Sequence, residues 1–211
     1  MSQIEFDETN ATEEEIWAWY MAEYENPNQI TQFLLSNFFN TIKKCIGRLE
    51  ATDKLLEIGC GCAMSSQRIF KMLKGQCFEA SEFDQRLVNN LQNINLPFPV
   101  RQESVFELKR DDNSFDCLLL LEVLEHLNDY ELALHELFRV SNKYVIISVP
   151  NEPIWSFLNL LRGKYIQDKG NTPGHVNKWS VKTLEVLLSK YGQIEFLATP
   201  LPWIVALVRK Y

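Results

Sequence analysis

The chain has 211 residues, of which 21 are basic and 28 are acidic, so its formal net charge is -7. Eight of the acidic residues and no lysine or arginine precede Lys43, so the rest of the chain carries 21 basic and 20 acidic residues and is nearly neutral. This distribution contains no basic stripe that could neutralise phosphates, which argues against a dedicated nucleic-acid-binding protein and against attachment to an anionic membrane surface.

The first 50 residues predict two helices. An apolar stripe at helical spacing is formed by Trp17, Tyr20, Met21 and Tyr24. The sequence Asn26-Pro27-Asn28 ends this helix, and a second amphipathic pattern extends from Ile30 to Ile46. We expect the two helices to form an N-terminal helical cap, residues 1–50, on the domain that follows.

From Asp53 onward, short apolar runs alternate with amphipathic stretches, which is typical of β-α units stacked around a parallel sheet. The predicted strands cover residues 54–58, 77–81, 100–103, 115–121 and 144–149, and the predicted helices cover residues 64–73, 84–91 and 129–140. The run from Cys117 to Leu121 is continuously apolar, as in a strand that is covered on both faces. We therefore expect this strand at the centre of the sheet.

The last third of the chain predicts an irregular segment, a helix and two strands. Residues 151–178 are rich in Pro, Gly and Asn and predict a lid-like insertion. Ser180 is a suitable N-cap for a helix over residues 181–191, with Gly192 as its stop. The strands predicted at 194–198 and 203–208 have a connection too short for a parallel crossover, so the last strand should run antiparallel. Residues 51–211 thus predict an α/β domain with a doubly wound, Rossmann-like, seven-stranded and mostly parallel sheet.

A glycine-containing loop follows the first predicted strand. Ligands of open α/β sheets bind beyond the carboxyl ends of the strands, where glycine lets the backbone approach a ligand closely. A dinucleotide fingerprint of the G-x-G-x-x-G type needs a small residue at the last position, but Met64 is large. The loop instead has an acidic residue, two glycines and another small residue at alternate positions, namely Glu57, Gly59, Gly61 and Ala63.

This spacing resembles the first motif of class I S-adenosylmethionine (SAM)-dependent methyltransferases, although Ala63 stands where a third glycine is usual. The resemblance extends over residues 53–211 and includes the segments 112–116, 121–127, 148–153 and 175–180. This combination of motifs is similar to that of small-molecule methyltransferases, including the ubiquinone and menaquinone biosynthesis type. The resemblance implies SAM as cofactor and in-line transfer of a methyl group to a small-molecule acceptor.

The resemblance also implies a set of cofactor-binding residues. Glu82 lies 21 positions after Gly61, where the family places the carboxylate that accepts from both ribose hydroxyls. Phe83 is expected against the adenine, and either Glu103 or Ser104 is expected to accept from the adenine amino group. The complete predicted set is Glu57, Gly59, Cys60, Gly61, Glu82, Phe83, Glu103, Ser104, Val105, Leu121 and Glu122.

Two histidines are candidates for catalysis. His126 begins the loop after the central strand, and His175 lies in the segment expected to cover the pocket. Either ring is a candidate to take a proton from the molecule that receives the methyl group. The alternative for His126 is to hold the loop over the cofactor. Glu122 and Glu125 flank this loop, and one of them is a candidate to face the methionine ammonium or the acceptor; the alternative is that they are solvated or cap a helix.

The chain has five cysteines, with no C-x-x-C pair and no nearby histidine at ligand spacing, so we expect reduced thiols and no metal site. The N-terminus lacks the basic and apolar regions of a signal peptide, and no run of about 18 apolar residues occurs. These features favour a cytoplasmic protein without membrane insertion.

Two other functions fit parts of the pattern. One is a non-catalytic module that binds SAM or a partner protein on the same fold. The other is an NAD-dependent oxidoreductase, which Met64 and the order of the motifs disfavour. The sequence indicates neither the acceptor atom, which can be oxygen, nitrogen, carbon or sulfur, nor an oligomeric state.

Overall fold

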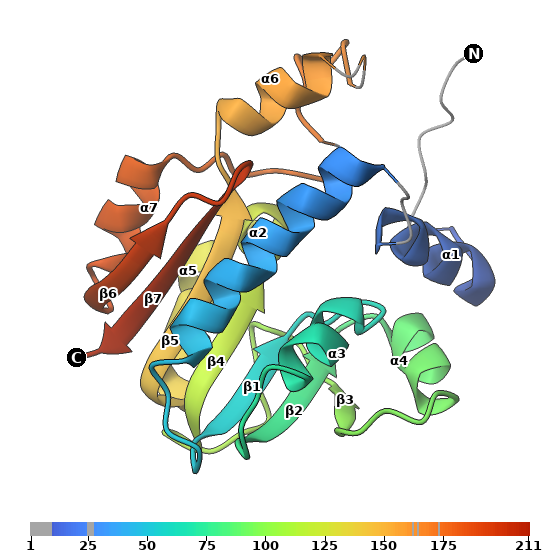
Figure 1. Cartoon of the computed structure of the whole chain (residues 1–211). Helices are drawn as coiled ribbons and strands as arrows, with labels where there is room; N and C mark the ends of the chain where they lie inside the picture. The colour runs from blue at the N-terminus through green and yellow to red at the C-terminus, as the bar shows by residue number, and fades with distance from the viewer. Residues whose placement is uncertain (1–9, 25–27, 162, 164, 173) are drawn as a thin grey trace.

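The protein is represented by a computed structural model that describes residues 10–24, 28–161, 163, 165–172 and 174–211. One sheet contains seven strands in the order β3-β2-β1-β4-β5-β7-β6 (Figure 1). Only β7 runs antiparallel, and it pairs with both β5 and β6. The predicted seven-stranded, mostly parallel sheet with an antiparallel last strand is therefore confirmed. The bounds are β1 Lys54–Ile58, β2 Cys77–Glu82, β3 Val100–Gln102, β4 Phe115–Leu121, β5 Ser141–Pro150, β6 Gly192–Ala198 and β7 Trp203–Lys210.

Seven α-helices and one short 3-10 helix surround the sheet. Asp84, Asp129 and Ser180 begin three of them, and each side chain accepts a hydrogen bond from a backbone N–H of the first turn. The bounds are α1 Glu13–Tyr24, α2 Gln29–Ile46, α3 Met64–Phe70, α4 Gln85–Gln92, η1 Leu124–His126, α5 Tyr130–Val140, α6 Ile154–Leu161 and α7 Val181–Leu188.

Four local predictions were wrong. The helix expected over residues 64–73 ends at Phe70, and the helix expected over 181–191 ends at Leu188. Gly192 begins β6 instead of stopping a helix, because its hydrogen faces the backbone of β7, where a Cβ would lie 2.2 Å from the Arg209 carbonyl oxygen. The segment 151–178 contains the helix α6, which the surrounding Pro, Gly and Asn residues concealed. The predicted break at 26–28 lies largely outside the described residues.

Each face of the sheet has its own hydrophobic core. Leu118 and Leu120 of β4 pack on the face covered by α5 and α7, whereas Cys117 and Leu119 pack on the face covered by α2 and α3. All four side chains are fully buried. The continuous apolar run therefore forms the central strand, because a strand between two helical layers has no solvent-facing side.

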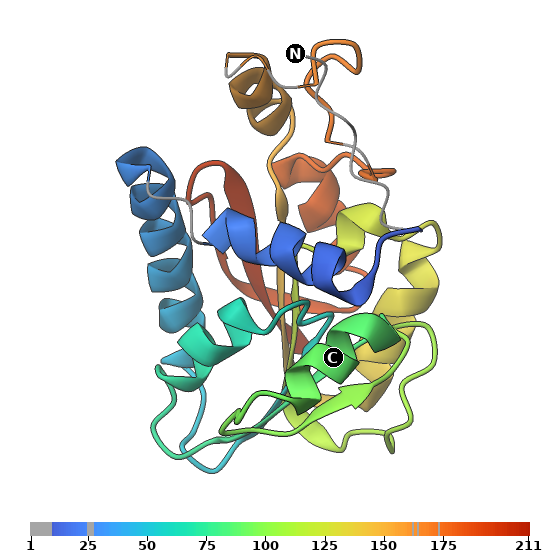
Figure 2. The same cartoon turned by 90° about the vertical axis from the view of Figure 1, so that its right-hand side faces the viewer.

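The two N-terminal helices occupy different places. α2 packs on the sheet through a buried stripe that includes Phe38, Ile42 and Cys45, so it belongs to one of the helical layers. α1 instead crosses the carboxyl edge of the sheet next to α4 (Figure 2). Asn89 and Asn90 of α4 donate to the Glu13 side chain and carbonyl at 2.8 and 3.2 Å. α1 is thus held over the edge where a ligand is expected.

The segment 151–178 projects from the same edge beyond α2 (Figure 1). Its turns are tied to α6 by the Trp155 indole N–H, which donates to Thr172 Oγ1 at 2.8 Å, and by Asn159, which donates to the Gly170 carbonyl at 3.0 Å. Among the helices of the described ranges, none is long and apolar enough to cross a membrane.

Candidate functional site

The loop after β1 has three residues in the left-handed region. Gly59, Gly61 and Ala63 have φ angles of 74°, 55° and 58°. A Cβ on Gly59 would lie 2.7 Å from Val123 Cγ2, so glycine is required there for space as well as for conformation. Ala63 adopts the same conformation at a cost of about 1 kcal/mol, so the departure from a third glycine leaves the loop geometry intact.

Glu57 lies behind this loop near the end of β1. Its side chain is almost completely buried, and Ser65 Oγ donates to Oε1 at 3.0 Å. Oε2 has no hydrogen-bond partner among the described residues. Burial and, to a smaller extent, the nearby negative charge of Glu82 raise the pKa of Glu57 to about 7. A cationic group at the loop would therefore find an unpaired buried carboxylate oxygen.

Glu82 connects the end of β2 to the glycine loop. Its Oε2 accepts from the Gly61 N–H at 2.7 Å, and its Oε1 accepts from the N–H groups of Phe83 and Asp84 at 2.8 and 2.9 Å. Burial raises the pKa of this carboxyl even though the three N–H groups favour its charged form. The adjacent Phe83 is 67% exposed, which leaves an aromatic face open beside the loop.

The structure distinguishes the two residues at the end of β3. Glu103 is buried, and Arg110 Nε donates to both of its oxygens at 2.9 and 3.2 Å. Arg110 Nη1 also donates to Glu79 Oε2 at 2.8 Å. Ser104 is partly exposed and accepts only a long hydrogen bond of 3.3 Å from the Phe106 N–H. The ion pair thus occupies the Glu103 carboxylate, whereas the Ser104 hydroxyl is engaged only by this long hydrogen bond. The neighbouring Val105 is buried.

The ends of β4 and β5 are joined at Glu122. Its N–H donates to Ser148 Oγ at 3.1 Å, and the Ser148 hydroxyl donates to Glu122 Oε1 at 2.7 Å. Glu122 has a φ of 58°, which turns the chain sharply after the buried Leu121. Ser148 thus orients a predicted site residue, and the sequence alone gave this serine no role.

His126 and His175 are brought together although 49 positions separate them in the sequence. Their ring centroids lie 4.8 Å apart at 86°, and Trp155 stacks against His175 at 6.1 Å. His126 Nδ1 lies 3.1 Å from the Gly174 carbonyl oxygen. Burial lowers the pKa of both histidines, that of His175 to about 4, so both rings are neutral at pH 7.

Glu125 completes this cluster. It is almost fully buried, and its Oε2 has no partner among the described residues. Burial and the charge of Glu122 raise the pKa of Glu125 well above its ordinary range. Its carbonyl accepts from the N–H groups of Val176 and Asn177 at 2.9 and 3.0 Å, which fastens the 151–178 segment to the loop after β4. Sequence spacing could not find this group, because its two parts come from separate segments.

α1 covers the glycine loop. A Cβ on Gly61 would lie 3.1 Å from the Tyr20 ring, so this aromatic side chain sits directly against the loop backbone. A hollow of about 490 Å³ lies beside the cluster and is lined by Phe106, His126, Leu127, Asn128, Asp129 and Leu132. A larger hollow of about 750 Å³ lies between α2 and residues 199–201, but none of the predicted site residues lines it. The glycine loop and Glu82, at the carboxyl ends of β1 and β2, therefore define the candidate ligand-binding site, and the larger hollow does not.

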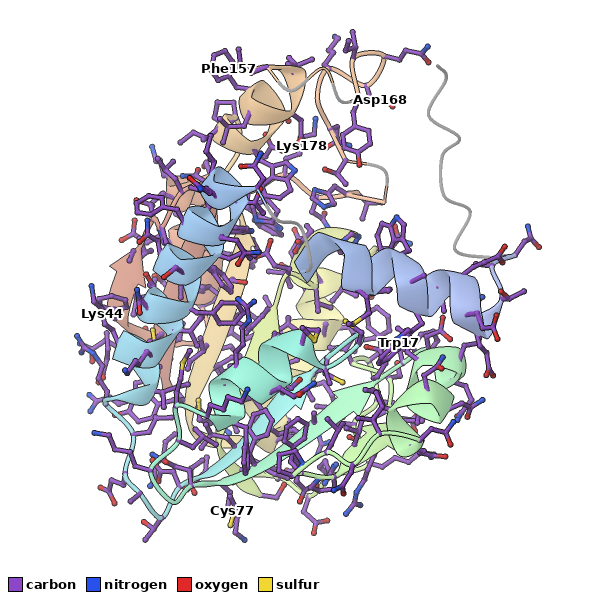
Figure 3. The ribbon with its side chains drawn as sticks, turned by 45° about the vertical axis from the view of Figure 1, so that its right-hand side comes forward. Trp17, Lys44, Cys77, Phe157, Asp168 and Lys178 are labelled. Carbon is purple, nitrogen blue, oxygen red and sulfur yellow. The ribbon has the colours of Figure 1, made fainter. Side chains whose placement is uncertain are left out.

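All five cysteines are free thiols, as the sequence predicts. Cys60 is buried in the glycine loop, where burial raises the pKa of its thiol and keeps it neutral. Cys77 lies at the opposite end of the molecule from Phe157 and Lys178, while Trp17 of α1 lies between them (Figure 3). The exposed thiol is therefore remote from the carboxyl edge of the sheet.

Residues 29–193 match the sequence profile of the methyltransferase domain. No curated protein matches the chain significantly. Among solved structures, magnesium protoporphyrin IX methyltransferase from Synechocystis PCC 6803 with bound SAH is similar, with a TM-score of 0.66 and 13% identity over 92% of this chain and 93% of that chain. A SAM-dependent methyltransferase from Aquifex aeolicus has a TM-score of 0.63 and 17% identity, with 82% of this chain and 89% of that chain covered.

A possible histamine N-methyltransferase from Thermotoga maritima gives a TM-score of 0.61 and 18% identity, with 92% of this chain and 99% of that chain covered. At these identities the structural likeness concerns the fold alone. The match to the sequence profile, by contrast, covers most of the chain and includes every predicted site residue.

Proposed function

The chain belongs to the methyltransferase-domain family, and we propose that it transfers a methyl group from SAM to a small-molecule acceptor. The observation that carries this proposal is the link between Glu82 and the Gly61 N–H at the carboxyl edge of the sheet. It combines a glycine loop open to close approach with a carboxylate that is already oriented by three N–H groups.

The residues present fit SAM. The backbone of Gly59, Cys60 and Gly61 forms a cradle without side chains at the two left-handed glycines, and a Cβ at Gly59 would clash. The orphaned Oε2 of Glu57 supplies a buried acceptor behind the cradle. We assign Glu57 and Glu122, with the buried Leu121, to the methionine end of SAM, where a positive ammonium complements their charge.

The nucleoside end of SAM is assigned to Glu82, Phe83, Ser104 and Val105. A carboxylate has about four acceptor positions, and three of those of Glu82 already receive N–H groups. One ribose hydroxyl can therefore bind at Oε2 directly, and binding both requires one N–H bond at Oε1 to be exchanged. Ser104 replaces Glu103 in our assignment because Arg110 engages the carboxylate.

SAM supplies a methyl group that its sulfonium already activates, so the protein mainly has to align the acceptor and exclude water. Alignment of this kind contributes up to about 7 to 11 kcal/mol. The neutral ring of His126 or His175 can take a proton from an acceptor that arrives protonated, which typically adds about 10²- to 10⁴-fold. With a pKa of about 4, His175 is the weaker base of the two.

We assign the choice of acceptor to the parts outside the sheet. These are the N-terminal cap, whose helix α1 lies over the glycine loop, and the segment 151–178, which is fastened to the Glu125 carbonyl. The near-neutral domain has no basic stripe, which favours a small molecule over a nucleic acid. An acceptor of the ubiquinone or menaquinone type and a cytoplasmic location, suggested by the sequence motifs and the free thiols, belong to the same proposal.

Calorimetric titration with SAM and with NADH tests the cofactor. We expect SAM alone to bind. Replacing the exposed Phe83 by alanine should weaken SAM binding about 5- to 150-fold, the range that loss of one base–aromatic stack produces. Phe33→Ala is the matched control, because this phenylalanine on α2 is 65% exposed and away from the loop. Equal affinities of the two variants would contradict the assignment.

Activity is tested by the release of S-adenosylhomocysteine with a panel of phenols, amines, thiols and activated carbon acids. Formation of this product together with a methylated acceptor supports the proposal. Tight SAM binding without product for any acceptor class would favour the non-catalytic binding module instead.

A further inference from the structure

Glu125, His126 and His175 form a cluster of metal-ligand type at the end of β4. Each residue offers one ligand atom, and these atoms all lie within 4.8 Å of one another. Ligand atoms around a tetrahedral ion with bonds of about 2.1 Å lie about 3.4 Å apart, so the cluster needs to contract by at most about 1.4 Å. Small rotamer changes of two imidazoles and a carboxylate can provide this contraction.

The protein already orients His126 as a ligand. A carbonyl oxygen only accepts hydrogen bonds, so the 3.1 Å contact with Gly174 requires a proton on His126 Nδ1. The lone pair is then on Nε2, which is the nitrogen available to a cation. Metal-binding histidines commonly donate their other N–H to a backbone carbonyl in this way, which fixes the tautomer and the ring orientation.

Glu125 provides the second, independent observation. Glu125 is 1% exposed, and its Oε2 has no hydrogen-bond partner among the residues that the structure describes. A buried carboxylate oxygen without a partner is costly unless a cation or donor binds it. The further charges near the cluster are Glu122, which adds negative charge beside Glu125, and Lys178, which acts on His175.

We propose that Glu125, His126 and His175 bind a divalent ion of the first transition row, with Zn²⁺ as the best fit. Two imidazoles and one carboxylate are a common ligand set of zinc sites that keep an open position. Mg²⁺ and Ca²⁺ prefer oxygen ligands and fit this mixed set less well. Cation binding here does not depend on SAM.

The position suggests what the ion does in the reaction, and this part rests on the proposed function. His126 also lines the hollow of about 490 Å³, so a small molecule in the hollow can reach the open coordination position. A hydroxyl bound to a divalent ion loses its proton more readily. With the ion in place, the lone pairs of His126 and His175 are occupied, so the proton passes to solvent water and not to either ring. The acceptor class that this arrangement favours is therefore a hydroxylated small molecule.

The test uses the full chain after treatment with EDTA and dialysis. Calorimetric titration with Zn²⁺ should give one ion per chain, and Mg²⁺ should bind much more weakly. Glu125→Gln and His175→Ala should each weaken Zn²⁺ binding by more than the roughly 10- to 100-fold that loss of an outer partner costs. His135→Ala is the matched control, because His135 is exposed on α5 and contacts Tyr191 edge-to-face, outside the cluster.

Thermal unfolding separates loss of the site from loss of the fold. Without metal, Glu125→Gln should melt no lower than the original protein, since the amide keeps the shape of the buried carboxyl group. Added Zn²⁺ should raise the Tm of the original protein and of His135→Ala but not of Glu125→Gln. Absence of Zn²⁺ binding, or equal binding by all variants, would overturn the metal site. If Zn²⁺ binds but SAM does not, only the proposed function fails; if SAM binds but Zn²⁺ does not, only this inference fails.

Discussion

Replacing Glu57 by glutamine removes an ionisable group from behind the glycine loop with little change in shape. Burial raises the pKa of Glu57 in the folded protein to about 7, whereas its ordinary value is 4.5. Between these two pH values the folded state binds more protons than the unfolded state, so the free energy of unfolding falls as the pH rises. Below pH 4.5 the carboxyl is neutral in both states, and this penalty is absent.

The size of the effect follows from the shift. At 1.36 kcal/mol per pKa unit, the difference between 4.5 and about 7 corresponds to about 3 kcal/mol. Glutamine resembles the protonated carboxyl and does not ionise. Glu57→Gln should therefore be more stable than the original protein by about 1 kcal/mol or less at pH 5 and by about 3 kcal/mol at pH 8.

Urea unfolding of both proteins at several pH values from 5 to 8 measures this difference. The other titrating groups are common to both proteins, so their contributions cancel in the difference between the two free energies of unfolding. Glu185→Gln, an exposed change on α7, is the matched control. A pH-independent difference for Glu57→Gln would refute the reasoning. In saturating SAM the pH dependence should shrink, because a nearby ammonium stabilises the charged carboxylate.

Three further changes test the fold around the site. Gly59→Ala should cost about 2 to 4 kcal/mol in urea unfolding because it adds a clash to a left-handed φ, while Gly163→Ala, at a φ of 69° with no atom within 4 Å, should cost only about 1 kcal/mol. Arg110→Gln should lose about 3 to 5 kcal/mol because it leaves a buried carboxylate unpaired, whereas Lys190→Ala should lose less than about 1 kcal/mol at an exposed pair. Ser180→Ala should cost about 1 kcal/mol, since it removes the capping box of α7, and an unchanged Tm would contradict this role.

Much of the site was predictable because its residues are close in sequence and their spacing repeats a strand-loop-helix unit. The alternating small residues after β1 and the acidic residue ending β2 lie as expected at one edge of the sheet, joined by the Gly61–Glu82 hydrogen bond. The engagement of Glu103 by Arg110 was not predictable. Arg110 returns to Glu103 through a turn that carries no periodic signal.

The histidine cluster shows more clearly what could not be predicted from the sequence alone. His126 and His175 were separate candidates, and Glu125 was one of several alternatives for its loop. The structure brings the three together because the carbonyl of Glu125 binds two N–H groups of the 151–178 segment. No cysteine belongs to this cluster, and its two histidines are 49 positions apart, so the spacing of residues around the cysteines contains no sign of it.

By itself, the sequence determined the order of the strands, the helices other than α6 and the short η1, the central position of β4 and the antiparallel last strand. These properties follow from hydrophobic periodicity and connection length, which are local in the chain. Only the tertiary structure decided that α1 crosses the glycine loop, that Arg110 engages Glu103 and that Glu125 and His126 meet the distant His175. Such contacts join side chains from remote segments, and their geometry depends on how the packed layers place those segments in space.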